Sequence, residues 1–155
     1  MIVVDANLLL YAVNTAVPQH EKAKDWLQRQ LVEGIQVRLP WIVIIAFIRI
    51  TTSRSAFSPP LTVEHSLGLV NDWLALDNVQ IVKPGPHHWE ILSRLLLMTG
   101  TGGNLTNDAH IAAIAIESSA LVCSADTDFL RFQGVQYHNP LIDMSIQEPS
   151  LAYIA

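Results

Sequence analysis

The sequence lacks the paired cysteines typical of secreted proteins and the long apolar runs of membrane-spanning proteins, and it has few charged residues. Its 155 residues include one cysteine, Cys123, and only 15% of them are charged. A single cysteine excludes an internal disulfide, and because Cys123 lies in an apolar run we interpret it as an inert core thiol rather than a nucleophile. The longest apolar run, residues 41–48, is far shorter than the roughly 20 residues of a membrane-spanning helix. With no basic leader before Asp5, we expect a cytoplasmic protein with no signal peptide and no membrane contact.

Sequence motifs of several enzyme classes are also missing. No G-x-G-x-x-G nucleotide motif, H-E-x-x-H zinc motif or G-x-S-x-G nucleophile motif occurs. The glycine-rich stretch 100–103 follows a predicted helix rather than a strand, so we interpret it as a flexible loop. His87, His88 and His110 have no partner at zinc-site spacing and are expected at the surface or at helix starts. The four tryptophans fall in helical patterns, and we expect most of them in the core, with one or two lining a partner groove.

Short apolar runs alternate with helical patterns along the whole chain. The runs that predict strands are residues 2–4, 35–39, 79–82, 121–123 and 135–137. The predicted helices cover the run at 8–10 and residues 18–33, 40–52, 62–74, 86–98 and 104–118, with Thr62 as a helix cap. This alternation calls for right-handed crossovers and a mainly parallel sheet. We therefore predict one α/β domain over residues 1–155, a three-layer α/β/α sandwich around a sheet of about five strands.

The charges are unevenly distributed. The net charge is −5, which by itself argues against a polyanionic partner. Residues 20–54 nevertheless carry six basic and three acidic side chains, whereas residues 101–155 carry only Arg131 against six acids. The split fits a phosphate-facing flank beside an acidic pocket, and it fits ordinary solvated helix faces equally well.

Several of these acids follow predicted strands. Asp5 ends the first strand, Asp126 and Asp128 follow a later one, and Asp108 opens the alanine-rich helix before it. Ligands of open parallel sheets bind at the carboxyl ends of the strands, so we expect these carboxylates to converge there. Each acid also has a simpler interpretation: Asp108 complements a helix dipole, Asp126 and Asp128 form a turn, and Asp5 is structural.

Convergence of carboxylates would require a counter-charge. Two carboxylates about 4 Å apart repel by about 4 kcal/mol at an effective dielectric constant of 20, so three pairs cost on the order of 12 kcal/mol. That is comparable to the whole net stability of a domain. Protons or a divalent cation must relieve the repulsion, and oxygen ligands favour Mg²⁺ or Mn²⁺ over zinc.

Three segments together resemble a known family. V-V-D-A-N at residues 3–7, N-D-A-H-I-A-A at 107–113 and S-A-D-T-D-F at 124–129 resemble the PIN-domain ribonucleases, specifically VapC-type toxins. The likeness covers almost the entire chain in the same order and spacing. It implies a Mg²⁺-dependent endoribonuclease acting on RNA, dimeric, and held inactive by a cognate VapB-like antitoxin.

The resemblance also implies roles for individual residues. Asp5 and Asp108 would be metal ligands, Asp126 a further member of the acidic centre, and Asp128 matches a less uniform acidic position beside it. Asn7 and Ser124 match small polar positions that support the ligands by hydrogen bonds; a local backbone hydrogen bond is the simpler role for both. Arg49 and Arg54 are the cations expected nearest an RNA backbone, with plain solvent exposure as the alternative.

One position departs from the family pattern. The family places a glutamate on the helix after the second strand, where this chain has Phe47, and no acid occurs between Glu33 and Glu64. A second metal is therefore doubtful, and a catalytically weakened RNA- or protein-binding module is the alternative function. A phosphatase-like enzyme with Asp5 as nucleophile is a third hypothesis, against which Asn7 counts because such enzymes need an aspartate there.

Overall fold

A five-stranded, all-parallel sheet forms the middle layer of the molecule. The computed structural model describes residues 1–142, so Asp143 and Glu148 of the acidic C-terminal region lie outside the described residues. The strands are β1 (Ile2–Val4), β2 (Val37–Pro40), β3 (Val79–Val82), β4 (Leu121–Cys123) and β5 (Gln136–His138), in the spatial order β3-β2-β1-β4-β5. The central strand β1 is buried throughout, as its unbroken apolar run predicts.

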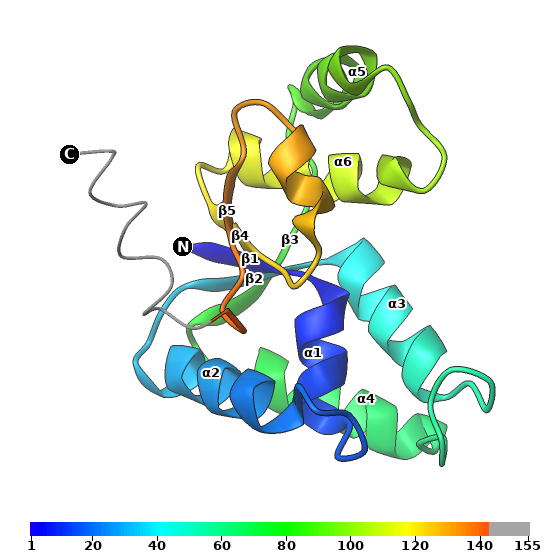
Figure 1. The fold of residues 1–155 in the computed structure, drawn as a ribbon. Helices are drawn as coiled ribbons and strands as arrows, with labels where there is room; N and C mark the ends of the chain where they lie inside the picture. Colours follow the sequence, from blue (N-terminus) through cyan, green and yellow to red (C-terminus); the bar gives the residue numbers. More distant parts are fainter. Residues whose placement is uncertain (143–155) are drawn as a thin grey trace.

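Helices cover both faces of this sheet (Figure 1). One layer holds α1 (Ala6–Val13), α2 (His20–Val32), α3 (Trp41–Thr51) and α4 (Val63–Leu74). The other holds α5 (His88–Thr99), α6 (Leu105–Glu117) and a short 3₁₀ helix, η1 (Thr127–Arg131). The predicted three-layer α/β/α architecture is therefore confirmed, and the sheet is wholly rather than mainly parallel. Within residues 1–142, no helix is long and apolar enough to cross a membrane.

Local side-chain chemistry determines where several helices begin and end. The Asp5 Oδ1 accepts a hydrogen bond of 2.7 Å from the Ala6 amide and caps α1 at the end of β1. Thr62 caps α4 as predicted, accepting 3.1 Å from the His65 amide. Gly100, in the left-handed conformation with φ 69°, ends α5. The first of these caps also places a carboxylate at the carboxyl end of the sheet.

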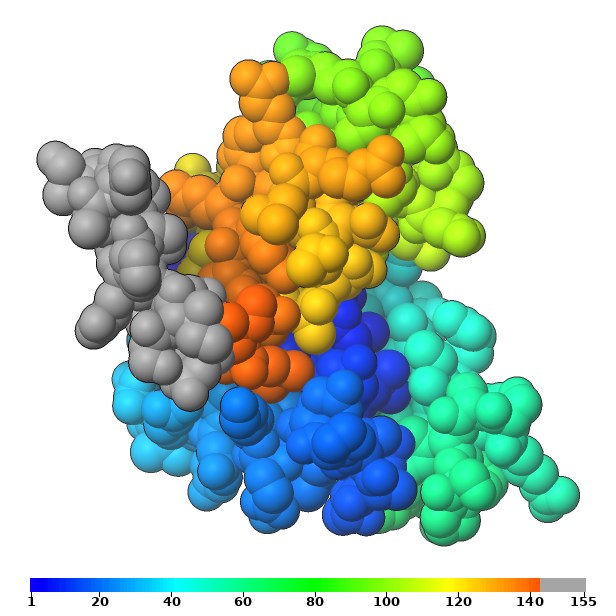
Figure 2. Space-filling model, viewed as in Figure 1, coloured from blue at the N-terminus to red at the C-terminus, as the bar shows by residue number. Residues whose placement is uncertain are grey.

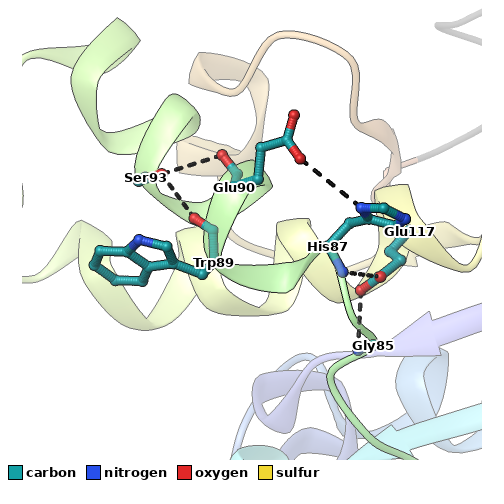
Figure 3. Close-up of polar contacts among 6 residues, drawn as sticks. All are labelled: Gly85, His87, Trp89, Glu90, Ser93 and Glu117. Carbon is teal, nitrogen blue, oxygen red and sulfur yellow. Dashed lines mark hydrogen bonds and ion pairs between the residues drawn. The ribbon is translucent and has the colours of Figure 1, made fainter.

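Glu117 at the end of α6 accepts hydrogen bonds from the loop that leads into α5 (Figure 3). Its two carboxylate oxygens accept hydrogen bonds from the Gly85 amide at 2.9 Å and the His87 amide at 2.8 Å. A Cβ atom at position 85 would overlap the same carboxylate, which explains the glycine. His87 is exposed and His88 is the first residue of α5, as expected, and His88 lies 2.8 Å from His110 of α6, with both of these side chains half-buried. These contacts hold α6 in place, and α6 carries Asp108.

Two of the four tryptophans lie in or against the core, where we expected most of them, and Leu67 of α4, which fits the apolar pattern of that helix, is 43% exposed. Trp26 is buried and Trp73 packs against the core, but Trp41 is 50% and Trp89 75% exposed. Both exposed rings belong to the first turn of their helices, outside the buried stripe. Cys123 is buried, and burial raises the pKa of its thiol to about 12, as expected of an inert core thiol.

Phe47 belongs to this core. Its side chain is fully buried on α3, and its ring meets the Trp73 ring of α4 edge-to-face, with centroids 5.1 Å apart. Val43 and Thr51, one turn away on either side, are buried on the same face of the helix. The position therefore joins α3 to α4 and supplies no acidic group.

We predict that Phe47→Ala lowers the free energy of unfolding by about 3–5 kcal/mol, because it leaves a cavity in a close-packed core. Phe47→Leu is expected to cost less, since more of the volume stays filled. Urea denaturation followed by circular dichroism measures both changes. Trp89→Ala is the control, and an equal loss of stability in that exposed variant would contradict this account of the core.

Candidate metal centre

Asp5 lies at the carboxyl end of β1, the strand between β2 and β4. It is 8% exposed, and its amide donates to the Cys123 carbonyl at 3.0 Å, so the β1–β4 ladder continues one residue past the strand. Its Oδ1 accepts from the Ala6 amide, while Oδ2 accepts from the Ser124 hydroxyl at 2.7 Å and the Asn7 amide group at 3.2 Å. Three donors therefore hold this carboxylate in one orientation.

Asn7 and Ser124 connect the end of β1 to the loop after β4. The Asn7 Nδ2 lies 3.0 Å from the Ser124 Oγ, and the Asn7 Oδ1 accepts from the Ala125 amide at 3.2 Å. The Ser124 Oγ also accepts from the Asp126 amide at 3.0 Å. Both residues thus contact Asp5 and also bind backbone amides of the loop that carries Asp126.

Three further carboxylates, from α6 and the turn that begins η1, lie close to one another. Asp108 from the first turn of α6, together with Asp126 and Asp128 around the start of η1, presents carboxylate oxygens that all lie within 4.8 Å of one another. Asp126 caps η1, accepting from the Asp128 amide at 2.9 Å, so the predicted turn exists and brings both acids to the same place. In the space-filling view, the orange segment that includes η1 lies between the green α5 region and the blue N-terminal region (Figure 2).

Burial and the charges of neighbouring acids disfavour the ionised forms of Asp5 and Asp108. The pKa of Asp108 is raised from 3.8 to about 7, first by burial and then by the charges of Asp5, Asp126 and Asp128. Burial also raises the pKa of Asp5; hydrogen bonds from Ser124 and Ala6 oppose this rise, and the charge of Asp126 adds to it. Among the described residues, no lysine or arginine forms an ion pair with any of these carboxylates.

These residues fit a divalent cation. Three oxygens from separate carboxylates form a hard, all-oxygen ligand set, the kind that Mg²⁺ and Mn²⁺ prefer. A bound cation would also remove the repulsion that raises the pKa of Asp108. The geometry brings Asp128 into the cluster as closely as Asp126, although the sequence pattern treats it only as an auxiliary acid.

The two arginines expected near RNA belong to α3 and the turn after it, which carry none of the four acids. Both are exposed, Arg49 in the last turn of α3 and Arg54 in the turn beyond it. The helix begins at the carboxyl end of β2 with Trp41, so Arg49 lies about 12 Å further along the helix axis. Tyr137 of β5 is near the acids instead, and it was not expected there because an aromatic residue in a short apolar strand is typical of core packing.

We predict that the metal-free protein loses stability as the pH rises from about 4 to about 7. In this window the folded chain keeps the Asp108 proton while the unfolded chain releases it, so the free energy of unfolding falls with pH. Asp108→Asn should weaken this dependence, leaving the part that the raised pKa of Asp5 contributes, and stabilise the protein at pH 8 by on the order of 1 kcal/mol, a value reduced for the solvent screening of a half-buried group.

Urea denaturation in EDTA across this pH range provides the measurement. Asp72→Asn, at an exposed position on α4, is the control and should leave the pH dependence intact. An Asp108→Asn variant whose stability falls with pH as steeply as that of the parent chain would contradict the assigned electrostatics.

Comparison with known proteins relates this geometry to a family. Residues 2–135 match the family model described as PIN domain. Ribonuclease VapC37 of Mycobacterium tuberculosis is 44% identical over 140 residues, which cover 90% of this chain and 97% of that protein. Ribonuclease VapC33 of the same organism is 39% identical over 141 residues, covering 91% and 99% of the two chains.

Solved structures share the fold at low sequence identity. The structure of VapBC2 from Rickettsia felis, bound to a DNA fragment from its promoter, contains a chain that matches with a TM-score of 0.66 and 19% identity, over 90% of this chain and 98% of that one. PAE2754 from Pyrobaculum aerophilum matches with a TM-score of 0.56 and 16% identity, over 98% and 95%. On these matches and those of the sequence, the chain belongs to the PIN domain family and, within it, to the VapC ribonucleases.

Proposed function

We propose that this chain is a Mg²⁺- or Mn²⁺-dependent endoribonuclease and the toxin of a type II toxin–antitoxin pair. The observation that carries the proposal is the group formed by Asp108, Asp126 and Asp128, whose carboxylate oxygens lie within 4.8 Å of one another. No lysine or arginine among the described residues forms an ion pair with them. The names of the relatives, ribonucleases VapC37 and VapC33, support RNA as the substrate.

Each acid has a role in this proposal. Asp108, Asp126 and Asp128 supply ligand oxygens, and Asp5 completes the centre from the end of β1. The hydrogen bonds that Asp5 accepts do not exclude ligation, since each carboxylate oxygen has two lone-pair sites. Asn7 and Ser124 keep the Asp5 carboxylate and the Asp126 loop in fixed positions, so the ligands need little rearrangement when a cation binds.

When bound, a divalent cation supplies Lewis-acid chemistry, polarising a phosphate oxygen and making water a stronger nucleophile for hydrolysis of the phosphodiester. The protein's own contribution is to hold the acids close together before substrate arrives. With a net charge of −5 and an acidic centre, the chain repels RNA unless that centre is neutralised. We propose that Arg49 and Arg54 contact the RNA backbone at a distance from the cleaved phosphodiester.

We predict that Asp126→Asn lowers the rate of RNA cleavage in Mn²⁺ by about 100-fold or more. The loss of one ligand charge removes several kcal/mol of transition-state stabilisation, and each 1.4 kcal/mol is a factor of ten. Gel analysis of a structured RNA, with EDTA as the metal-free control, measures the rate.

Asp72→Asn makes the same change of residue type at an exposed site on α4. This control variant should cleave RNA at the parental rate. Cleavage that persists in EDTA, or that is unaffected by Asp126→Asn, would rule out this assignment of the acidic centre.

The toxin role predicts a specific pattern of growth. Expression of the parent chain should arrest cell growth, and co-expression of an antitoxin encoded beside its gene should restore growth. One solved structure with the same fold is described as a toxin–antitoxin complex from Klebsiella pneumoniae, which supports an antitoxin partner. We also propose that the assembly is built on a homodimer. Colony counts after induction measure the effect, and Asp126→Asn is the inactive control. Normal growth under full expression of the soluble parent chain would contradict the toxin role.

A second candidate function is a binding module with weakened catalysis. The observation that favours it is Phe47, which occupies the family's glutamate position and packs into the core against Trp73. The same cleavage assay separates the two candidates: RNA that binds in Mn²⁺ without being cut would favour the module, and metal-dependent cleavage favours the nuclease.

A further inference from the structure

Arg131 is the one lysine or arginine in the part of the chain that supplies most of the acids. Residues 101–142 contain no other such side chain, whereas they contribute Asp108, Asp126 and Asp128. Arg131 is the last residue of η1, the 3₁₀ helix that Asp126 caps. It is exposed, and among residues 1–142 it forms no ion pair with any carboxylate. Within the described part of the chain, its guanidinium group is therefore available to a ligand.

The geometry of η1 places Arg131 on the same side of this helix as one of the acids. In a 3₁₀ helix, side chains three residues apart are eclipsed, and each residue rises about 2.0 Å along the axis. Asp128 and Arg131 are three residues apart in η1. Arg131 therefore starts from the same edge of the helix as Asp128, about 6 Å further along the axis. Because Asp128 belongs to the close group of carboxylates, Arg131 borders the candidate metal centre.

The inner side of η1 is anchored to the core. Phe129 is fully buried, and its ring stacks on the ring of Tyr137 with centroids 6.0 Å apart. η1 also packs against α6, the helix that carries Asp108. Its outer side is open to solvent, since Leu130 is 70% exposed. Arg131 thus belongs to an element that is fixed to the scaffold on one side and accessible to a large ligand on the other.

A phosphate group is the ligand that suits a guanidinium group in this place. Arginine binds phosphate by two parallel, charge-assisted hydrogen bonds. The acids beside Arg131 repel an RNA backbone, so a positive charge at their border offsets part of that repulsion. The displacement of about 6 Å from Asp128 favours a neighbouring phosphate over the one at the metal centre. Arg49 is on α3 instead, which carries none of the acids.

We propose that Arg131 is an RNA-binding residue, whose guanidinium group binds the phosphate next to the one that is cleaved. The inference rests on the proposed ribonuclease function, since it names a group that holds the substrate beside the metal centre. An interaction with a phosphate that does not react is made equally before and during the reaction. Arg131 therefore acts on substrate binding rather than on the chemical step.

Arg131→Gln tests the proposal by removing the charge from an exposed position, where the fold does not depend on it. We expect KM for the structured RNA in Mn²⁺ to rise about 10-fold while kcat changes little. Arg131→Lys keeps the charge without the paired hydrogen bonds, so its KM should lie between those of the parent chain and Arg131→Gln. Arg29→Gln, the same change at an exposed position of α2, is the matched control and should keep the parental KM.

The dependence of KM on salt concentration tests whether the ligand is a phosphate. Each phosphate of a single strand that a basic side chain contacts contributes about 0.7 to the slope of log affinity against log salt concentration. The slope measured from 1/KM should therefore be less steep by about 0.7 in Arg131→Gln. Arg131→Lys should keep the parental slope. An unchanged slope in Arg131→Gln would overturn the proposal.

Metal binding separates contact with RNA from support of the acids. Removing a positive charge beside the carboxylates should not weaken the binding of a cation, because the charge of Arg131 can only repel it. Calorimetric titration of the full chain with Mn²⁺ alone measures this affinity. A Mn²⁺ affinity that falls in Arg131→Gln would assign the residue to the structure of the metal centre and overturn the proposal.

The results also distinguish this inference from the proposed function. A parent chain that cleaves no RNA in Mn²⁺ would overturn both. A parent chain that cleaves RNA with the same KM as Arg131→Gln would overturn the role of Arg131 alone, and so would an equal rise of KM in the Arg29→Gln control. An Arg131→Gln variant that cleaves like its parent but is no longer silenced by a co-expressed antitoxin would assign Arg131 to a protein partner, and this result would also overturn the proposal.

Discussion

Repulsion among carboxylates at the carboxyl end of the sheet is the constraint on which the site depends. Asp5, Asp108, Asp126 and Asp128 come from three separate stretches of chain, and burial together with their mutual repulsion raises the pKa of Asp108 to about 7. The parallel pairing of β1 with β4 and the hydrogen bonds of Asn7 and Ser124 oppose this repulsion. The cluster of carboxylates therefore lowers the stability of the fold when no cation is bound, and a bound cation would remove this electrostatic repulsion.

The sequence predicts the architecture well because each layer has a local pattern. The uninterrupted apolar run of β1 indicates a buried parallel strand, and the Thr62 cap and the apolar spacing of the helices indicate their ends and buried faces. The rule on strand ends predicts a convergence of Asp5, Asp108 and Asp126, and in the structure Asp108 and Asp126 belong to one close group of carboxylates that does not include Asp5. The rule does not predict the close approach of Asp128, because this depends on the 3₁₀ geometry of η1.

Two further features could not be read from residue types. Trp41 and Trp89 fit helical patterns, yet their exposure depends on which face of the first turn packs against the rest of the fold. The place of Tyr137 depends on the register of β5 with β4, a long-range pairing that no local pattern specifies. The absence of an acid at position 47, by contrast, is visible in the sequence. The structure adds that Phe47 joins α3 to α4 by packing against Trp73. A cation set made from Asp108, Asp126 and Asp128 does not need an acid at that position.

The central claim is that these three aspartates share one divalent cation, and anomalous diffraction from crystals soaked in Mn²⁺ tests it most directly. The account predicts a single strong anomalous peak bound by oxygens of Asp108, Asp126 and Asp128, at distances of about 2.0–2.2 Å, close to those of Mg²⁺. A fully soaked crystal with no peak among these carboxylates, or with Mn²⁺ bound only elsewhere, would contradict it.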